Sequence, residues 1–357
     1  NVQLRLGSTQ AALGHYQASL ELAKKLSLQD PDNTEYQRDL SVYYERLGDI
    51  KLRLGDIQTA LGHYQASLEL RKKLSLQDPD NVEYQRVLSV SYEKLGNIQL
   101  RLGDIQAALM HYQTSFELAK KLSLQDPDNT EYQRDLSVSY ERLGNIQLRL
   151  GDSQSALGHY QASLELAKRL SLQDPDNVGY QRDLSVFYSN LGDIQLRLGD
   201  TQSALGHYQT SLEIDKKLSL QALDNTGYQE GLSVTYDRLG DIQLRLGDTQ
   251  AALGHYQASL ELAKKLSLQD PDNSQYQQDL TYGYARIASV FLRLKNYQKA
   301  IYHKKQIIKM ASENSDVAID ALGNIGRYQL LLGDFKDAQT SSLKAYTQKP
   351  TSLAWGI

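Results

Sequence analysis

Hydrophobic residues recur at intervals of three and four along the chain, in pairs of runs that are separated by short polar turns. A representative first run consists of Leu136, Tyr140, Leu143, Ile146 and Leu150. The second run of the same pair consists of Leu157, Tyr160, Leu164, Ala167 and Leu170. This spacing places each run on one face of an α-helix, so the pattern predicts two amphipathic helices with both runs buried. No segment of the sequence shows the alternation of a β-strand.

The polar turns predict where these helices end. Gly151 and Asp152 lie between the two runs, where glycine favours the end of a helix and aspartate is a candidate N-cap of the next. The segment 174–177, Asp-Pro-Asp-Asn, follows the second run and should end one helix and cap another. Each unit is therefore predicted to be two antiparallel helices of about 20 residues each.

This pair of helices is repeated at a constant interval. The sequence Leu-Arg-Leu-Gly recurs at positions i and i+48 (55 − 7 = 48), and its glycines are Gly7, Gly55, Gly103, Gly151, Gly199 and Gly247. The glycine is replaced at Lys295, but Leu-Arg-Leu persists before it. Residues 19–33 are identical to residues 259–273. Repetition of one unit along the chain predicts a stack of hairpins, each buried against its neighbours.

The repeated residues resemble the tetratricopeptide signature. The pattern Tyr140-x2-Leu143-Gly144, followed by Ala156-x3-Tyr160, matches it with Tyr where Trp is usual, and it recurs in the units around positions 44–64 and 236–256. The small residues Gly144 and Ala156 are expected to let the two helices approach closely. The resemblance covers essentially the whole chain. It implies an all-α fold, a right-handed superhelical solenoid of antiparallel helix hairpins.

Two features depart from that signature. Gln147 occupies the position of the second aromatic residue of the first helix. The repeat is also longer, because equivalent positions lie at i and i+48 instead of the i and i+34 of the family. The added residues divide into about seven for each helix, which is two turns and leaves the buried stripes in register. Long-period repeats of this kind resemble those in large bacterial signalling proteins, and kinesin light chains carry a less extended version.

We expect the units to form a single solenoid over residues 1–357, with about eight repeats and truncated at both ends. Residues 1–33 are predicted to be a partial first unit, in which the tail of one helix ends at Gly7. Near-identical long units occupy 34–273, and diverged units that return towards the standard repeat occupy 274–350. Residues 351–357 are expected to begin a further helix.

Composition narrows the classes of function. The formal net charge of −4 disfavours a general nucleic-acid binder, and the absence of cysteine excludes a disulfide framework and a thiol nucleophile. No apolar run reaches the roughly 18 residues of a membrane span, so we expect a cytoplasmic protein without a membrane partner. No catalytic motif is recognisable, which predicts a protein that is not an enzyme and takes no cofactor.

The seven histidines occupy one position per unit, directly before the same aromatic position of the second helix. Neighbouring helices lie about 10 Å apart, whereas zinc requires its ligands at about 2 Å. One histidine per unit therefore cannot share an ion with the next. We interpret the row as a structural position and predict no metal site.

In the family that the sequence resembles, the first helix of each hairpin lines a concave groove that holds the ligand. The residues opposite the buried stripe, such as Val138, Glu141 and Leu148, would then face that groove. The predicted partner-binding residues form rows of cations and of Asp or Asn: Arg46, Asp49, Arg53, Lys94, Asn97, Arg101, Arg142, Asn145, Arg149, Asp193, Arg197, Arg238, Asp241 and Arg245. The alternative is an ordinary solvated face with pairs such as Asp49 and Arg53 at i and i+4.

Three functions remain open from the sequence. The leading hypothesis is a protein–protein interaction scaffold that binds a peptide or an extended partner segment in the groove. The second is a sensor or regulatory arm of a larger multidomain bacterial enzyme or signalling protein, joined covalently to other domains. The third is an architectural spacer that associates with itself end to end.

Overall fold

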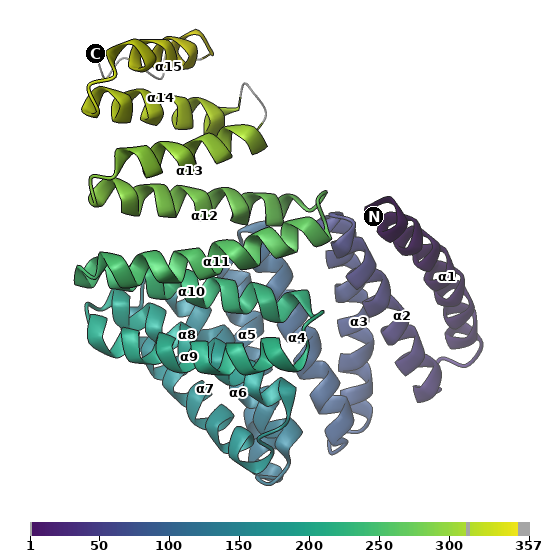
Figure 1. The fold of residues 1–357 in the computed structure, drawn as a ribbon. Helices are drawn as coiled ribbons and strands as arrows, with labels where there is room; N and C mark the ends of the chain where they lie inside the picture. The colour runs from purple at the N-terminus through teal and green to yellow at the C-terminus, as the bar shows by residue number, and fades with distance from the viewer. Residues whose placement is uncertain (1, 312–314, 349–357) are drawn as a thin grey trace. The chain divides into compact units, whose positions relative to one another are not determined.

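The computed structural model describes residues 2–311 and 315–348, and all regular structure in these residues is helical. Fifteen helices follow one another in consecutive packed hairpins, as Figure 1 shows. This confirms the predicted all-α fold class. The helices fall into two compact units, residues 1–204 and 205–357, with the boundary inside α9. The single continuous solenoid stays a prediction.

The first unit contains eight helices and the start of a ninth. Their bounds are α1 Val2–Gln29, α2 Thr34–Arg53, α3 Ile57–Gln77, α4 Val82–Leu102, α5 Ile105–Gln125, α6 Thr130–Arg149, α7 Ser153–Gln173, α8 Val178–Arg197 and α9 Thr201–Gln221. The second unit contains the rest of α9 and six further helices. These are α10 Thr226–Leu246, α11 Thr249–Gln269, α12 Ser274–Arg293, α13 Tyr297–Met310, α14 Asp316–Leu331 and α15 Phe335–Gln348.

Helix lengths follow the sequence pattern. The helices α2 to α12 have 20 or 21 residues, as predicted from the lengthened repeat. The last three helices have only 14 to 16 residues. The additional two turns are therefore absent from α13, α14 and α15.

The predicted helix ends are confirmed in the representative hairpin of α6 and α7. Gly151 adopts a left-handed conformation with φ of 88°, which a residue without Cβ reaches at no steric cost. The Asp152 carboxylate accepts a hydrogen bond of 3.0 Å from the Ser155 backbone N–H and so caps α7. Asn177 caps α8 in the same way, by accepting from the backbone N–H of Gly179 and Tyr180.

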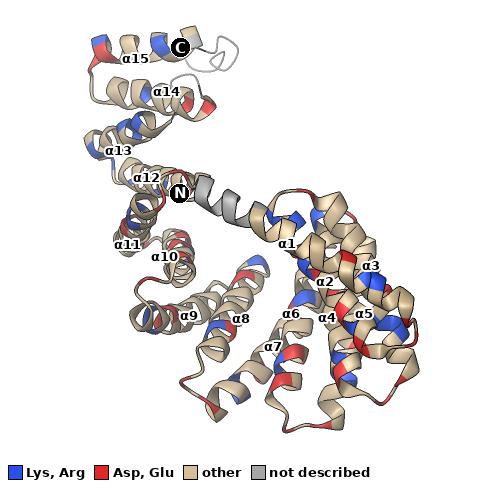
Figure 2. Ribbon diagram, turned by 90° about the vertical axis from the view of Figure 1, so that its right-hand side faces the viewer, with Lys and Arg blue, Asp and Glu red and all other residues tan. Residues whose placement is uncertain are grey.

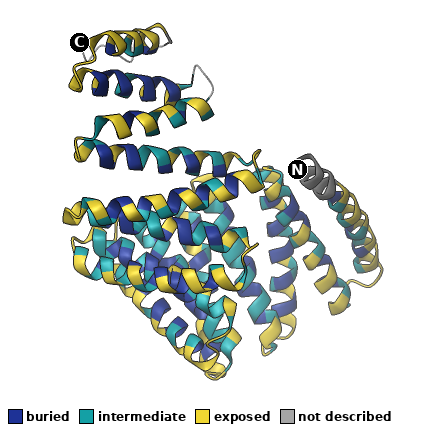
Figure 3. Cartoon of the chain, in the orientation of Figure 1, coloured by how far each residue is buried: buried dark blue, intermediate teal, exposed yellow. Residues whose placement is uncertain are grey.

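Most of the predicted stripe residues are buried, but Tyr140 and Leu157 are only half-buried, and one residue needs a larger correction. Leu136, Leu143 and Ile146 of α6 lie in the interior, as do Tyr160 and its successors on α7 (Figure 3). Leu150, by contrast, is 41% exposed. It is the C-cap residue of α6, so it lies beyond the last turn of the helix.

The close approach of the two helices is confirmed, and its partner is an aromatic ring. A Cβ atom added to Gly144 would lie 2.6 Å from the Tyr160 ring, closer than real Cβ contacts. Ala156 is itself fully buried. The pairing of a glycine with a tyrosine ring recurs at Gly48 and Gly96, so it is a property of the repeat.

The prediction for the first residues is wrong. The sequence led us to expect a helix that ends at Gly7, but α1 runs without a break from Val2 to Gln29. The other repeats have Asp after this glycine, and its carboxylate caps the next helix, whereas position 8 is Ser; serine is a comparable N-cap, so this difference does not explain the unbroken helix. The further helix expected at 351–357 lies outside the described residues.

Candidate functional site

Charged side chains join the first helices of successive hairpins in the first unit. The Lys94 ammonium of α4 donates to Glu45 Oε1 and to Asp49 Oδ1 of α2, each at 2.9 Å. One repeat later, Arg142 Nε of α6 donates to Glu93 Oε1 of α4, also at 2.9 Å. We call these contacts the inter-repeat ladder. Lys94 and Arg142, both predicted to bind a partner, are thus already paired with carboxylates of the preceding repeat.

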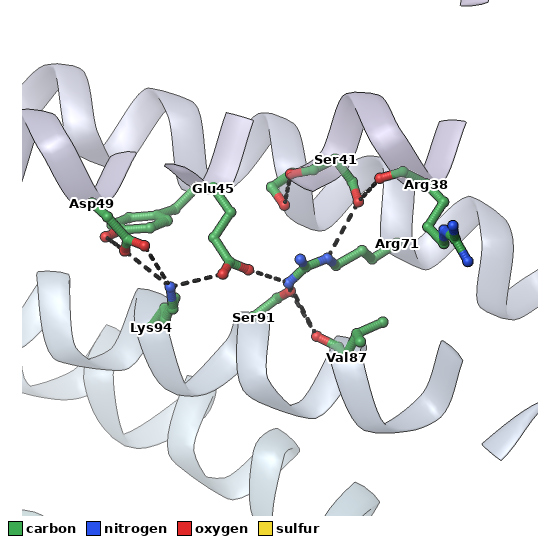
Figure 4. A network of polar contacts seen from close by, with 10 residues as sticks. Arg38, Ser41, Glu45, Asp49, Arg71, Val87, Ser91 and Lys94 are labelled. Carbon is green, nitrogen blue, oxygen red and sulfur yellow. Dashed lines mark hydrogen bonds and ion pairs between the residues drawn. The ribbon is translucent and has the colours of Figure 1, made fainter. Parts of the chain in front are cut away.

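A buried arginine extends the ladder into the interior, as Figure 4 shows. Arg71 of α3 is 5% exposed and contacts Glu45 Oε2 at 2.5 Å and Ser91 Oγ at 2.7 Å. Burial alone would raise the pKa of Glu45, but Arg71 and Lys94 outweigh it and hold that pKa below its usual value. The sequence analysis missed this cluster. Its signal was Arg71 itself, because the same position is alanine in the units of Ala23, Ala119, Ala167 and Ala263.

The prediction that Glu141 lies on the exposed groove face is wrong. It was predicted to face a ligand, but it is only 7% exposed, and burial raises its pKa although Arg142 and Asn145 act against this. The next position of the cation row is Asn190, whose amide donates to Glu141 Oε1 at 3.3 Å. Since a neutral amide replaces the cation, the ladder loses its charge pairing at this repeat.

The row of Asp and Asn residues orients the second helix of each hairpin. The Tyr64 hydroxyl donates to Asp49 Oδ1 at 2.7 Å, and the Tyr112 hydroxyl donates to Asn97 Oδ1 at 2.8 Å. Burial raises the pKa of Tyr112 to about 12. The same contact recurs at Tyr160 with Asn145 and at Tyr256 with Asp241. Asp49 therefore pairs with Lys94 and Tyr64 across helices, not with Arg53 along its own helix as the alternative interpretation proposed.

A hollow of about 560 Å³ opens over α2, α4 and α6 beside the inter-repeat ladder. Six of the predicted partner-binding residues line it: Asp49, Lys94, Asn97, Arg101, Arg142 and Arg149. Four apolar or aromatic residues that the prediction omitted complete its wall: Leu52, Tyr64, Ile98 and Leu100. We call this site the basic hollow, since four of its five charged side chains are cations.

Two cations of the basic hollow remain available. Arg101 and Arg149 are both exposed, and among the described residues neither of them forms an ion pair or a side-chain hydrogen bond. They occupy the same position in α4 and α6, one repeat apart. Figure 2 shows that acidic and basic residues are otherwise dispersed over the helices. Two unpaired guanidinium groups that line one hollow are thus a local excess of positive charge in a chain whose net charge is −4.

The other predicted residues lie elsewhere. Arg46 and Arg53 are exposed on α2, outside the lining of the hollow, and Asn145 contacts Tyr160. Asp193 and Arg197 belong to α8 and also lie outside that lining. The remaining three lie on α10 in the second unit: Arg238, Asp241 and Arg245. There Arg286 of α12 contacts Asp237 and Asp241, which repeats the ladder within that unit.

The histidines pack against tyrosines of the first helices. The ring centroids of His63 and Tyr44 lie 6.0 Å apart, and those of His159 and Tyr140 are equally distant. Burial lowers the pKa of both histidines. In the part of the chain that the structure describes, no group of three or more His, Cys, Asp or Glu residues could hold a metal ion. None of the described helices is both long and apolar enough to cross a membrane.

Consecutive antiparallel hairpins whose sequence repeats with a constant period define a helical-repeat protein. The sequence profile of the tetratricopeptide repeat matches residues 38–121, 86–169 and 135–217, and a second profile of the same repeat matches residues 235–270. The first profile spans half of the chain. The chain therefore belongs to the tetratricopeptide repeat family, whose repeats generally mediate protein–protein interactions.

Solved structures share this fold at low sequence identity. A signal transduction ATPase with numerous domains, which has a tetratricopeptide repeat sensor and comes from Pyrococcus horikoshii, superposes with a TM-score of 0.63 and 15% identity over 98% of this chain and 49% of its own. Aspartyl phosphate phosphatase F from Bacillus subtilis superposes with a TM-score of 0.54 and 11% sequence identity. The match covers 91% of this chain and 73% of the phosphatase chain. BtubC from P. vanneervenii superposes with a TM-score of 0.51 and 19% sequence identity. The match covers 71% of this chain and 94% of the BtubC chain. No curated protein matches the sequence.

Proposed function

We propose that the chain is a protein-interaction scaffold that binds an extended peptide segment of its partner in the basic hollow. The observation that carries this proposal is the combination of unpaired, exposed Arg101 and Arg149 with the apolar wall of Leu52 and Leu100. Guanidinium groups form paired hydrogen bonds with carboxylates, and apolar side chains gain free energy when they leave water. Both contributions are available to a peptide that lies across α2, α4 and α6.

The ladder supports this assignment by fixing the frame of the site. Lys94 and Arg142 hold α2, α4 and α6 together through carboxylates of neighbouring repeats, so the wall of the hollow is preorganised. A preorganised site orders few of its own side chains when the ligand binds, which favours affinity. The partner would then contact Arg101 and Arg149, while Lys94 and Arg142 keep the helices in place.

The proposal is tested by reversing the two free charges. The double variant Arg101→Glu, Arg149→Glu should retain at most about one tenth of the partner that the parent chain captures, since each contact contributes a charged hydrogen bond. Arg169→Glu serves as the control, because Arg169 is exposed on α7 outside the hollow. Capture is quantified by mass spectrometry, and circular dichroism should show unchanged helicity and melting. Equal capture by the double variant and the parent would contradict the proposal.

A second candidate is a sensor segment of a larger signalling protein. It is supported by the fold of the Pyrococcus horikoshii signal transduction ATPase, whose tetratricopeptide repeat sensor belongs to a longer chain, of which the present chain covers 49%. A sensor would use the same hollow to detect its ligand. The coding sequence on either side of this chain tests the idea: an adjoining nucleotide-binding domain supports it, and a gene that encodes helical repeats alone would refute it.

A further inference from the structure

The second unit contains a cavity whose wall carries three carboxylates. The cavity has a volume of about 210 Å³ and lies between α10, α11 and α12, which follow one another in Figure 1. Its acidic residues are Glu230 and Asp237 of α10 and Asp279 of α12, and Val234 and Leu266 belong to its apolar wall. We propose that this site, which we call the acidic cavity, binds the guanidinium group of an arginine side chain from a partner protein. It shares no residue with the basic hollow.

Two of these carboxylates occupy positions that form a salt bridge elsewhere in the chain. In the first unit Arg86 Nε donates to Asp135 Oδ2 at 2.7 Å, and the same contact recurs one repeat later. Glu230 and Asp279 occupy the positions of Arg86 and Asp135 three periods further along (230 − 86 = 144). Four repeats have arginine where Glu230 stands: Arg38, Arg86, Arg134 and Arg182. The pair in the second unit thus keeps the aspartate, but a second carboxylate replaces the guanidinium group.

No cation of the described chain replaces the missing arginine. Glu230 Oε1 accepts a hydrogen bond of 2.7 Å from the Tyr276 hydroxyl, and Asp279 Oδ1 accepts one of 2.8 Å from the Gln275 side-chain amide. Among the described residues neither carboxylate forms an ion pair, and the second oxygen of each has no protein partner. Both side chains are half-buried. Because like charges that line one cavity repel each other, a cation from outside would stabilise this pair.

The third carboxylate also lacks a donor. Arg286 of α12 contacts Asp237 Oδ2 and neutralises this residue, so two of the three carboxylates remain without a cation. Asp237 Oδ1, however, is buried and has no hydrogen-bond partner among the described residues. A buried acceptor without a donor destabilises the protein, and a donor that enters the cavity beside it would offset this cost. The lining therefore favours a ligand that is both cationic and rich in N–H groups.

The lining distinguishes a guanidinium group from other cations. In the part of the chain that the structure describes, no group of three or more His, Cys, Asp or Glu residues could hold a metal ion, so these carboxylates do not converge on one point. A guanidinium group has five N–H donors spread over a plane and can reach separate carboxylates, whereas an ammonium group has three and is more strongly hydrated. Val234 and Leu266 offer apolar surface to the methylene groups of an arginine side chain.

Three short peptides that differ only in their central residue test the inference. That residue is arginine, lysine or citrulline, which has the shape of arginine but no charge. Titration of the methyl-labelled full chain, followed by NMR, should show that the arginine peptide shifts the methyl resonances of Val234 and Leu266. It should bind at least about tenfold more tightly than the citrulline peptide and about threefold more tightly than the lysine peptide.

Variants of the cavity complete the test. Glu230→Gln, Asp279→Asn should weaken binding of the arginine peptide at least about tenfold, whereas Glu261→Gln, on the exposed face of α11 outside the cavity, should not change it. Glu230→Arg should abolish binding without lowering the melting temperature, because the chain then supplies its own guanidinium group, as Arg86 does.

The inference is overturned if the parent chain does not bind the arginine peptide, or binds the lysine or citrulline peptide equally well. It is also overturned if the Glu230 variants bind like the parent. Arg101→Glu, Arg149→Glu should leave this affinity unchanged, so failure here does not affect the function proposed for the basic hollow.

Discussion

Gly144 shows how one residue determines the distance between two helices of a hairpin. The backbone of α6 passes so close to the Tyr160 ring that no side chain fits between them. Tyr160 is 2% exposed, and its hydroxyl donates to Asn145 at 2.7 Å, so the ring is fixed at both ends. A glycine inside a helix costs about 1 kcal/mol relative to alanine. The close packing of the tyrosine ring offsets that cost.

Two Gly→Ala variants in this hairpin should therefore have opposite effects. Gly144→Ala should lower the free energy of unfolding by about 1–3 kcal/mol, because its Cβ would overlap the buried ring. Gly158→Ala in α7 should raise it by about 0.5–1 kcal/mol, since that position has open space around it and alanine favours the helix. Urea unfolding followed by circular dichroism measures both. Stabilisation by Gly144→Ala would show that the ring moves aside.

At the same scale, the sequence could predict which positions are charged but not which charges are paired. The row of Lys94, Arg142 and the row of Arg101, Arg149 look alike in the sequence, because both recur once per repeat on the first helix. Their partners differ, since the carboxylates that neutralise Lys94 lie 45 and 49 residues away. Such contacts depend on helix packing, which no local pattern records.

At the scale of the element, helices and their ends were predictable because they are local. Hydrophobic stripes with a period of 3.6 residues predicted the helices. Gly151, Asp152 and Asn177 predicted where the helices end, because the conformation at a helix end depends on only a few neighbouring residues. The prediction failed at Gly7, where the following Asp is missing, and at Leu150, where the stripe continues past the last turn.

The histidine row makes the stability of the elements dependent on pH. Burial lowers the pKa of five of these histidines, and nearby lysines contribute at all of them except His159. The five are His63, His111, His159, His255 and His303. In the unfolded chain histidine has a pKa of about 6.5. The unfolded state therefore binds protons more readily than the folded state. The contribution of these histidines to the free energy of unfolding is fully present above about pH 6.5 and decreases as the pH falls below that value.

The contribution of the histidines to this pH dependence can be separated from that of the buried carboxylates. Burial raises the pKa of Asp135, Glu141 and Asp237, which favours the folded state as the pH falls and so acts in the opposite direction. Replacement of His63, His111 and His159 by Gln should flatten the decline of stability between about pH 7 and pH 5. The control is His15→Gln, since His15 is exposed on α1. Equal slopes for the triple variant and the parent would refute a role for the row.

At the scale of the whole molecule, repetition determined how much could be predicted. A constant period and the tetratricopeptide signature were sufficient to predict the fold class and the family, and six of the residues predicted to bind a partner line one hollow of the structure. The apolar wall consists of repeated positions, but its place in a hollow depends on how successive hairpins pack, and the buried Arg71 cluster depends on a residue in which one unit differs from most others, so neither was predicted.

The most direct test of the account is the reactivity of individual arginines towards phenylglyoxal, with and without the captured partner, read by mass spectrometry on the unmodified chain. The account predicts that the partner protects Arg101 and Arg149 together, while Arg169 on α7 and Arg245 on α10, both exposed and outside the hollow, react as before. Protection of Arg169 or Arg245 with Arg101 and Arg149 still reactive would contradict it.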